Sequence, residues 1–366
     1  MSGIYIKESL NELASVIKQY DNVFAIIDNN LKPYCTYFDN LNTIWISTSE
    51  REKSLERVSE LTKSLIGMGA DRGAFIIGVG GGITTDLVGF LASTYKRGVK
   101  FGFVPTTLLA QVDASIGGKN GVNVDSYKNM LGTITQPEWI YICPDMLKSL
   151  NPREFKAGIA EVLKTFILFD REYYHIAVEY FAELEELLDR SGSYSVDGLF
   201  YKLPLLTEII GRCAKYKCGV VERDEFEKGE RRLLNLGHSF AHSIEKICGE
   251  SSEYAINREC SGIMHGEAVS IGTLLAARMA VKMGRAEEAF AEMIECDLRR
   301  VGLPVSVPSH IETGESIPMA ELVAILKTDK KVSGESIHFI LPEGLECVKD
   351  IMINLKELEE IACDLC

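Results

Sequence analysis

The sequence lacks the uninterrupted apolar run of roughly 18 residues that a membrane-spanning helix requires. It is also short of positive charge, because 39 lysines and arginines face 53 aspartates and glutamates and leave a formal net charge of −14. Nucleic acids and anionic membrane surfaces are therefore poor partners for the surface as a whole. An anionic ligand would need a local basic pocket. The segment MSGIYIKESLNELASVIKQY carries charges where an export signal needs an apolar stretch, so we expect a cytoplasmic protein.

The ten cysteines are scattered from Cys35 to Cys366 and form no recognisable disulfide framework, which is typical of a reducing compartment. The one C-x-x-C pair, Cys363 and Cys366, lacks a second pair for zinc and a following helix for redox tuning, so we assign it no function. A content of 46% hydrophobic and 25% charged residues indicates an ordinary folded protein, and its length suggests about two domains.

The first part of the chain alternates short buried strands with helices. Strands are predicted at 22–28, 43–47, 74–79 and 99–104. The apolar spacing predicts a helix over 51–66, and a second helix is expected from about Thr84. Such alternation indicates a parallel sheet with right-handed crossovers. We therefore predict an α/β, Rossmann-like domain over residues 1–150.

Beyond residue 150 the pattern becomes mostly helical. Pro152 stands at the first position of a predicted helix. Further helices are predicted at 172–189, 236–248, 268–283 and 287–301. The only convincing strand is 336–341. We therefore predict a second, mostly α-helical domain over residues 151–366.

A glycine-rich turn lies where a predicted strand passes into a helix. It comprises Gly80, Gly81, Gly82, Ile83, Thr84, Thr85 and Asp86. Glycines let a ligand approach the backbone, and a helix N-terminus offers N–H groups to a phosphate. The pattern departs from G-x-G-x-x-G, so a phosphate site and a plain tight turn both remain open. Asp28, after an earlier strand, could accept from a ribose hydroxyl or cap a turn.

Histidine and glutamate form a second constellation. Only six histidines occur, and His238, His242 and His265 are close in sequence. His238 and His242 are four apart on one helix face, and Glu161 shares a helix face with Lys164. Two imidazoles and one carboxylate are typical of a catalytic zinc site with an open coordination position. A pair of histidines that only caps or hydrogen-bonds within the helical domain is the alternative.

Basic residues recur beside glycines or polar residues. They are Arg97, Lys119, Lys128, Lys164, Lys217, Arg231, Lys330 and Lys331. A lysine between glycines is a suitable phosphate or carboxylate ligand because little crowds the approach. Spacing alone does not show whether the fold gathers them, and a solvated surface charge is the alternative for each.

These motifs together resemble the 3-dehydroquinate synthases of the shikimate pathway, within the sugar phosphate cyclases. The resemblance covers most of the chain and rests on ordered segments. They are 80–86 (GGGITTD), 95–98 (YKRG), 105–113 (PTTLLAQVD), 117–119 (GGK), 128–129 (KN), 158–164 (GIAEVLK), 231–238 (RRLLNLGH), His242 and 264–269 (MHGEAV). Two positions depart from the family pattern, because Thr85 and Ala241 stand where glycine is usual.

The resemblance implies an N-terminal NAD-binding domain, a helical metal- and substrate-binding domain, and an active site between them. The implied metal ligands are Glu161, His238 and His265, holding Zn²⁺ or Co²⁺. The implied NAD contacts are Asp28, Glu50, Lys53, Gly80, Gly81, Gly82, Ile83, Thr84, Thr85, Asp86, Thr106, Thr107, Asp113, Lys119, Lys128, Met146, Leu147, Lys148 and Ser149. The implied substrate contacts are Asp113, Lys119, Lys128, Asn129, Lys164, Lys217, Arg231, Asn235, His242 and either Lys330 or Lys331. Arg97 is expected to reach the site of a neighbouring subunit in a homodimer.

The implied reaction converts 3-deoxy-D-arabino-heptulosonate 7-phosphate, a small anionic sugar phosphate, into 3-dehydroquinate and phosphate. It proceeds by transient NAD-mediated oxidation at C5, phosphate elimination, re-reduction and an intramolecular aldol closure. Three alternatives are a cyclase for sedoheptulose 7-phosphate or glucose 6-phosphate, a metal-dependent alcohol dehydrogenase, and a scaffold without catalysis. A 3-dehydroquinate synthase is favoured over the other cyclases by Arg231, Asn235 and Lys217. These residues suit a substrate carboxylate, which sedoheptulose 7-phosphate and glucose 6-phosphate lack.

Overall fold

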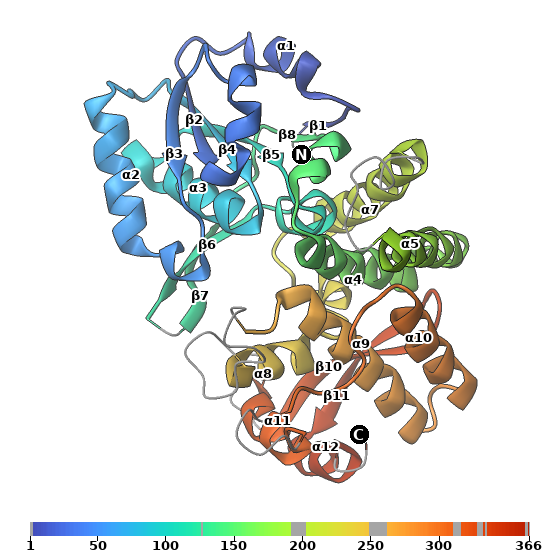
Figure 1. Cartoon of the computed structure of the whole chain (residues 1–366). Helices are drawn as coiled ribbons and strands as arrows, with labels where there is room; N and C mark the ends of the chain where they lie inside the picture. The colour runs from blue at the N-terminus through green and yellow to red at the C-terminus, as the bar shows by residue number, and fades with distance from the viewer. Residues whose placement is uncertain are drawn as a thin grey trace. The chain divides into compact units, whose positions relative to one another are not determined.

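The computed structural model describes residues 3–125, 127–191, 203–248, 262–309, 316–327, 332–333, 335–362 and 365. The chain divides into two compact units (Figure 1). The first comprises Met1–Phe155 with Leu199–Phe226, and the second comprises Lys156–Gly198 with Glu227–Cys366. Helix α7 (Leu203–Arg223) thus belongs to the first unit although the second unit precedes it in sequence. A division of function at residue 150 stays a prediction.

The first unit is built on a six-stranded sheet in which every strand pairing is parallel. In spatial order the strands are β1 (Gly3–Ile6), β8 (Trp139–Ile142), β5 (Lys100–Pro105), β4 (Phe75–Gly80), β2 (Val23–Asp28) and β3 (Asn42–Ile46). This confirms the predicted α/β class and the four predicted strands. The sequence analysis missed β1 and β8, which are only four residues long.

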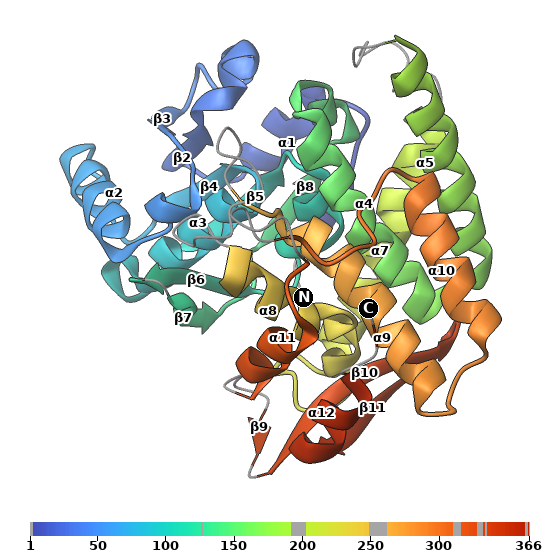
Figure 2. The same cartoon turned by 60° about the horizontal axis from the view of Figure 1, so that its bottom comes forward.

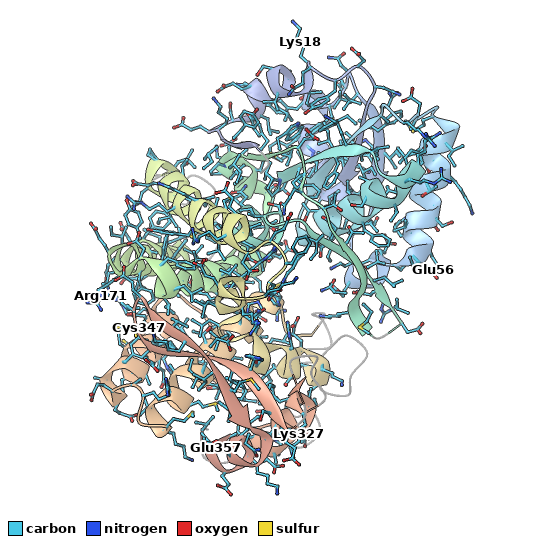
Figure 3. The ribbon with its side chains drawn as sticks, turned by 180° about the vertical axis from the view of Figure 1, so that it is seen from behind. Lys18, Glu56, Arg171, Lys327, Cys347 and Glu357 are labelled. Carbon is cyan, nitrogen blue, oxygen red and sulfur yellow. The ribbon has the colours of Figure 1, made fainter. Side chains whose placement is uncertain are left out.

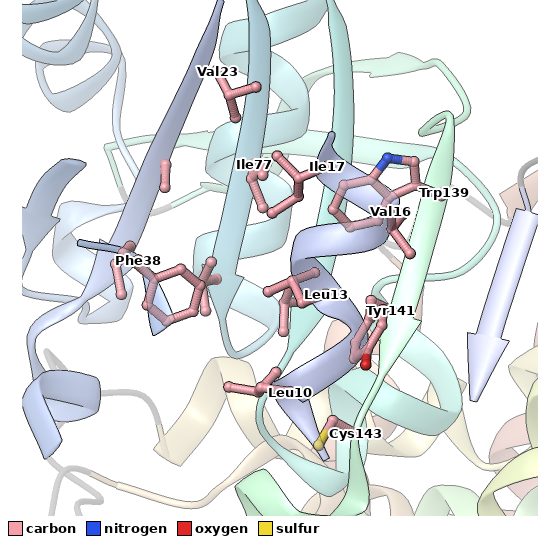
Figure 4. Packing of buried hydrophobic residues seen from close by; sticks show 14 of the residues in the cluster. Leu10, Leu13, Val16, Ile17, Val23, Phe38, Ile77, Trp139, Tyr141 and Cys143 are labelled. Carbon is pink, nitrogen blue, oxygen red and sulfur yellow. The ribbon is translucent and has the colours of Figure 1, made fainter. Parts of the chain in front are cut away.

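Alternate residues of the central strands face opposite layers of helices. Phe75 and Ile77 of β4 lie in the cluster formed with Leu13 of α1 (Leu13–Ile17) (Figure 4). Gly78 faces the other way, because a Cβ there would lie 3.1 Å from Val88 of helix α3 (Gly82–Thr94). The period of two explains why these strands are continuous apolar runs, since both faces are covered.

Two helices of the first unit begin at other residues than predicted. Helix α2 (Leu55–Gly67) starts four residues later than predicted, because the Ser54 side chain accepts from the backbone N–H of Arg57 and caps it. Helix α3 begins at Gly82, two residues before the predicted start. The other elements are η1 (Leu10–Glu12), η2 (Asn29–Tyr37), η3 (Glu50–Glu52), η4 (Tyr95–Arg97), the π-helix η5 (Ala110–Ala114), the hairpin β6 (Lys119–Val124) and β7 (Tyr127–Ile134), and η6 (Pro144–Ser149).

The second unit is organised around α9 (His265–Lys282), which packs against α8 (His238–Cys248), α10 (Glu288–Arg300) and β10 (Ser336–Gly344) (Figure 2). Nearly all of α9 is buried, as expected for a helix with neighbours on several sides. The other elements are α4 (Pro152–Phe169), which begins just before the unit, α5 (Arg171–Ser191), η7 (Glu230–Asn235), α11 (Met319–Leu326), β9 (Val332–Ser333), β11 (Cys347–Asn354) and α12 (Leu355–Ala362).

The prediction of a single strand in this half was wrong. Strand β10 pairs antiparallel with β11 on one side and with β9 on the other. Strand β11 was missed because most of its side chains are exposed or partly exposed. Its turn docks at the end of α4, where Glu346 N–H donates to Ile167 O at 2.8 Å and its carboxylate accepts from the Arg171 N–H. Figure 3 labels Arg171 and Cys347 at this corner.

Across the described ranges, no helix combines the length and the apolarity that crossing a membrane would need.

Burial predicts a graded thiol reactivity. Among the described cysteines, Cys35 and Cys296 are exposed. Burial raises the pKa of Cys143 and of Cys248 to about 11, so only about one of these thiols in a thousand is ionised at pH 8. We expect iodoacetamide at pH 8 to alkylate Cys35 and Cys296 well before the two buried thiols, as followed by peptide mass spectrometry. Equal rates in the folded protein would contradict the assigned core.

Candidate active site

Three donor side chains that are far apart in sequence meet in the second unit. Glu161 lies in α4, and His238 and His265 are the first residues of α8 and α9. One ligand atom from each lies within 4.8 Å of the other two. The Nε2 atoms of His238 and His265 are 3.6 Å and 3.4 Å from Glu161 Oε1. The structure therefore brings together the three residues that the sequence analysis selected as metal ligands.

Close backbone packing produces this convergence. A Cβ at Gly266 would lie 1.8 Å from the carbonyl oxygen of Ala157, so only glycine lets the start of α9 rest on α4. The Glu267 carboxylate accepts from the Met264 N–H at 2.9 Å and caps that start. Gly237, at φ +77°, turns the chain from η7 into α8. These contacts fix where each helix begins, and hence where each imidazole lies.

The site gathers opposite charges. Lys164 Nζ contacts Glu161 Oε2, and both side chains are almost completely buried. Burial alone would raise the pKa of Glu161, but Lys164 and His265 bring it down to about 2. Burial by itself would lower the pKa of His265. The carboxylates of Glu245 and Glu161 together outweigh this effect and raise the pKa to about 10. The buried carboxylate thus draws positive charge toward itself.

The residues fit a divalent cation. Two imidazole nitrogens and one carboxylate oxygen are the donor set that zinc and cobalt accept, and three protein ligands leave a coordination position open. His238 Nδ1 lies 3.1 Å from the carbonyl oxygen of Leu236, which only accepts, so this nitrogen carries the proton and Nε2 has the lone pair. That orientation is the one metal binding at Nε2 requires.

His242 stays outside the donor set. Its ring centroid is 5.6 Å from that of His238, and its side chain is exposed. The pair spaced by four therefore shares a helix face as predicted, but only its first member lies near the carboxylate. A substrate contact by His242 stays a prediction.

The glycine-rich turn lies between β4 and α3 in the first unit. Gly81 precedes the first turn of a 13-residue helix, so backbone N–H groups are presented as a dinucleotide phosphate would require. Thr85 is buried and its hydroxyl donates to Gly82 O at 3.0 Å. The threonine that replaces the usual glycine is therefore accommodated within α3, with its hydroxyl bonded to a backbone carbonyl of the same helix. Asp28 accepts from the Asn30 N–H at 2.9 Å, which is the capping alternative, and a ribose contact stays a prediction.

Lys53 connects the predicted cofactor contacts with a predicted substrate contact. Its buried ammonium is 2.5 Å from Asp86 Oδ2 and 2.6 Å from Asn129 Oδ1. Asn123 holds the same region, because its amide oxygen accepts from the Asn129 N–H at 2.9 Å and its NH₂ group donates to Glu50 Oε1 at 2.8 Å. Two predicted cofactor contacts, Lys53 directly and Glu50 through Asn123, therefore hold strand β7 at Asn129, a predicted substrate contact.

Asp113 and Lys217 form an ion pair in the first unit. Lys217 Nζ, from α7, is 2.7 Å from both the backbone oxygen and Oδ1 of Asp113. Asp113 lies in η5, whose Gln111 donates to Pro105 O at 3.1 Å and to Cys143 O at 2.9 Å. The π-helix is thereby anchored beyond the carboxyl ends of two parallel strands, where α/β sheets bind ligands.

The remaining predicted residues are spread over described elements. Arg231 in η7 is 2% exposed, whereas Lys119 and Lys128 are exposed on the β6–β7 hairpin. Arg97 ends η4 at φ +71°. Thr106 and Thr107 follow β5, and Met146, Leu147, Lys148 and Ser149 form most of η6. Lys330 and Lys331 lie outside the described residues, so the choice between them is open. The C-x-x-C cysteines also lie outside them.

Two acidic residues near the site were missed by the sequence analysis. Glu227 Oε1 accepts from the Asn235 side chain at 2.5 Å, and Glu245 Oε2 is 3.5 Å from His265 Nδ1. Glu245 follows His238 by seven residues and therefore lies on the same face of α8, which the sequence could have revealed. Nothing in the spacing marks Glu227, which takes φ +58°.

Comparison with known proteins decides the family. The model of the 3-dehydroquinate synthase N-terminal region matches residues 43–157, and that of the C-terminal region matches 158–332. The chain belongs to the 3-dehydroquinate synthase family. A 3-dehydroquinate synthase of Alkaliphilus metalliredigens is 34% identical over 97% of this chain and 93% of the relative. A 3-dehydroquinate synthase of Shewanella piezotolerans is 37% identical over 84% of this chain and 77% of the relative. The family is one of lyase-type cyclases.

Solved structures agree with the fold. A 2-epi-5-epi-valiolone synthase from Streptomyces hygroscopicus with NAD⁺ and Zn²⁺ bound has a TM-score of 0.79, is 26% identical, and is matched over 100% of this chain and 96% of its own. A 2-deoxy-scyllo-inosose synthase with carbaglucose-6-phosphate, NAD⁺ and Co²⁺ has a TM-score of 0.77 at 22% identity, over 99% and 96%. Both belong to the sugar phosphate cyclases named in the sequence analysis.

Proposed function

We propose that this member of the 3-dehydroquinate synthase family converts 3-deoxy-D-arabino-heptulosonate 7-phosphate into 3-dehydroquinate and phosphate, with NAD⁺ and a divalent zinc or cobalt ion as cofactors. The observation that carries the proposal is the convergence of Glu161, His238 and His265, with Lys164 against the same carboxylate. When bound, the cation supplies Lewis acidity toward substrate hydroxyls, and NAD⁺ supplies a reversible hydride acceptor at C5.

In the second unit, the protein's own work is orientation around the donor set. Lys164 is fixed by its ion pair with Glu161 and is buried, so its ammonium can hold a substrate hydroxyl at one position. Arg231 is buried and presents a planar guanidinium suited to a carboxylate. Asn235 lies four residues on in η7 and is held by Glu227. Arg231, Asn235 and Lys217 are proposed to bind the carboxylate of the heptulosonate.

In the first unit, the residues predicted to bind cofactor and substrate include the N-terminus of α3 and Asp113 of η5. The N-terminus of α3 is proposed to receive the cofactor phosphates, supported by Asp28, Lys53 and Asp86. Asp113, fixed by Lys217, is proposed to hold a reacting hydroxyl. Lys119, Asn129 and Arg97 of the first unit are proposed to bind the substrate phosphate, whose release is the elimination step, together with Lys330 or Lys331 from the segment 227–366. We also propose a homodimer in the cytoplasm, with Arg97 reaching the neighbouring subunit.

The test is incubation of the purified protein with the heptulosonate phosphate, NAD⁺ and zinc, measuring free phosphate and dehydroquinate together. The two products should appear in equal amounts with no net rise in NADH absorbance. Accumulating NADH would instead identify an alcohol dehydrogenase. Phosphate release from sedoheptulose 7-phosphate or glucose 6-phosphate, but not from the heptulosonate, would identify a different cyclase.

Replacing Lys164 by methionine should separate catalysis from metal binding. The imidazoles approach Oε1 of Glu161 and Lys164 contacts Oε2, so removing the ammonium leaves the donor set in place. We expect kcat to fall about 100-fold or more with zinc content unchanged, measured by steady-state kinetics and metal analysis. Lys156→Met is the matched control, because Lys156 lies two turns earlier in α4 and pairs with Glu185. A parallel loss of zinc in Lys164→Met would place Lys164 in the metal site.

A further inference from the structure

His265 presents its two ring nitrogens to two different carboxylates. Nε2 is 3.4 Å from Glu161 Oε1, inside the donor set, and Nδ1 is 3.5 Å from Glu245 Oε2, on the opposite side of the ring. The imidazole therefore bridges a buried carboxylate of α4 and a carboxylate of α8. Glu245 is close to buried, since its side chain is 10% exposed.

Resting on the proposed function, we propose that Glu245 is a positioning residue that holds His265 for the cation, fixing the Nδ1–H form of the ring so that Nε2 points at the metal. An ionised carboxylate only accepts hydrogen bonds, so the nitrogen that faces it carries the proton. Nε2 also faces a carboxylate, that of Glu161, so a cation that enters the donor set displaces the proton of Nε2, while Nδ1 keeps its proton against Glu245. A carboxylate behind a histidine ligand also increases the basicity of the donor nitrogen.

The two histidines are held in different ways. His238 is oriented by the carbonyl oxygen of Leu236 at 3.1 Å, a backbone group two residues away in the same turn. His265 has a side-chain carboxylate from another helix, so its orientation depends on the packing of α8 against α9. Since Glu245 lies seven residues after His238, one face of α8 supplies a ligand and the support of the other ligand. This arrangement makes α8 the element that organises both imidazoles.

Charge supports the same role. Glu161 and Glu245 contribute two negative charges around the donor set, and Lys164 contributes one positive charge. With both imidazoles neutral, the form that ligates a metal, a divalent ion changes this sum from −1 to +1, whereas removing Glu245 leaves the loaded site with +2. A buried site with more uncompensated positive charge binds a cation less well.

The experiment measures metal binding rather than turnover. Zn²⁺ affinity is determined by competition with a chelating dye, and the visible absorption of the Co²⁺-loaded full-length protein reports the geometry around the ion. Glu245→Gln should weaken Zn²⁺ binding about 10- to 100-fold and change the Co²⁺ spectrum. Glu245→Asp, which keeps the charge on a shorter side chain, should lie between. Lys246→Gln, at the next and exposed position of α8, is the matched control and should bind Zn²⁺ like the wild type.

The outcomes are separable from the proposed function. Wild-type affinity and an unchanged Co²⁺ spectrum in Glu245→Gln would overturn the role of Glu245 and leave the reaction assignment intact. A Glu245-dependent affinity in a protein that makes no dehydroquinate would support the role and overturn the reaction. A wild-type protein that binds neither ion would overturn both. Circular dichroism and thermal melting of the metal-free variants show whether each is folded, and a misfolded Glu245→Gln leaves Glu245→Asp to decide by the same measurements.

Discussion

Glu161→Gln is expected to lose the metal and all measurable cyclase activity. The amide keeps the size of the side chain but replaces an ionised ligand, so the donor set loses its only negative member. Loss of a group merely supporting a ligand weakens metal binding about 10- to 100-fold, and loss of a ligand itself should exceed that range. Metal analysis after dialysis, combined with the dehydroquinate assay, measures both effects.

The folded state limits how this first variant is interpreted. Glu161 is fully buried against Lys164, so the amide removes the negative charge that the buried ammonium contacts, and a loss of stability accompanies the loss of metal. Glu172→Gln, at an exposed position of α5, is the control and should retain both metal and activity. A Glu161→Gln protein that is metal-free yet fully active would eliminate the metal-dependent mechanism.

Gly266→Ala is expected to destabilise the protein and to empty the metal site without touching a ligand. The added Cβ would lie 1.8 Å from the Ala157 carbonyl oxygen, and a backbone atom, unlike a flexible side chain, has no alternative rotamer. The start of α9 must therefore move away from α4, and His265 moves with it. We expect the free energy of unfolding to fall by about 2–3 kcal/mol or more, measured by denaturant titration with metal analysis alongside.

Gly67→Ala provides the control for this second variant. Gly67 ends α2, and an added Cβ there would meet nothing within 4 Å. Its stability should change by less than about 0.5 kcal/mol. If Gly266→Ala behaved like Gly67→Ala, the close contact between α4 and α9 would be wrong, and the convergence of the donors would lose its structural cause.

The sequence predicted what local chemistry determines. The strands of the parallel sheet were recognised because burial on both faces gives continuous apolar runs, and Pro152 does start α4. Helix starts were less accurate, because a single capping side chain such as Ser54 fixes the first turn. Strand β11 was missed because its stability comes from pairing with β10, and its own side chains carry little apolar signal.

For the candidate site too, local sequence chemistry predicted some residues, and other features depend on the tertiary structure. Residue types and spacing singled out Glu161, His238 and His265, and the fold gathers them. The exposed position of His242 follows from the tertiary packing of α8, which no spacing reveals. The partners of Lys217 and His265 lie 104 and 20 residues away along the chain, so only the folded structure shows that Lys217 pairs with Asp113 and that His265 faces Glu245.

Because α7 returns to the first unit, the polypeptide passes from one unit to the other three times, after Phe155, after Gly198 and after Phe226. A gene fragment ending near residue 155 would encode the whole parallel sheet but omit Lys217, leaving Asp113 without its cationic neighbour. Expressing the first unit by itself therefore calls for a spliced reading frame that joins 199–226 to 1–155, and expressing the second unit calls for one that joins 156–198 to 227–366. A single truncation yields neither half intact.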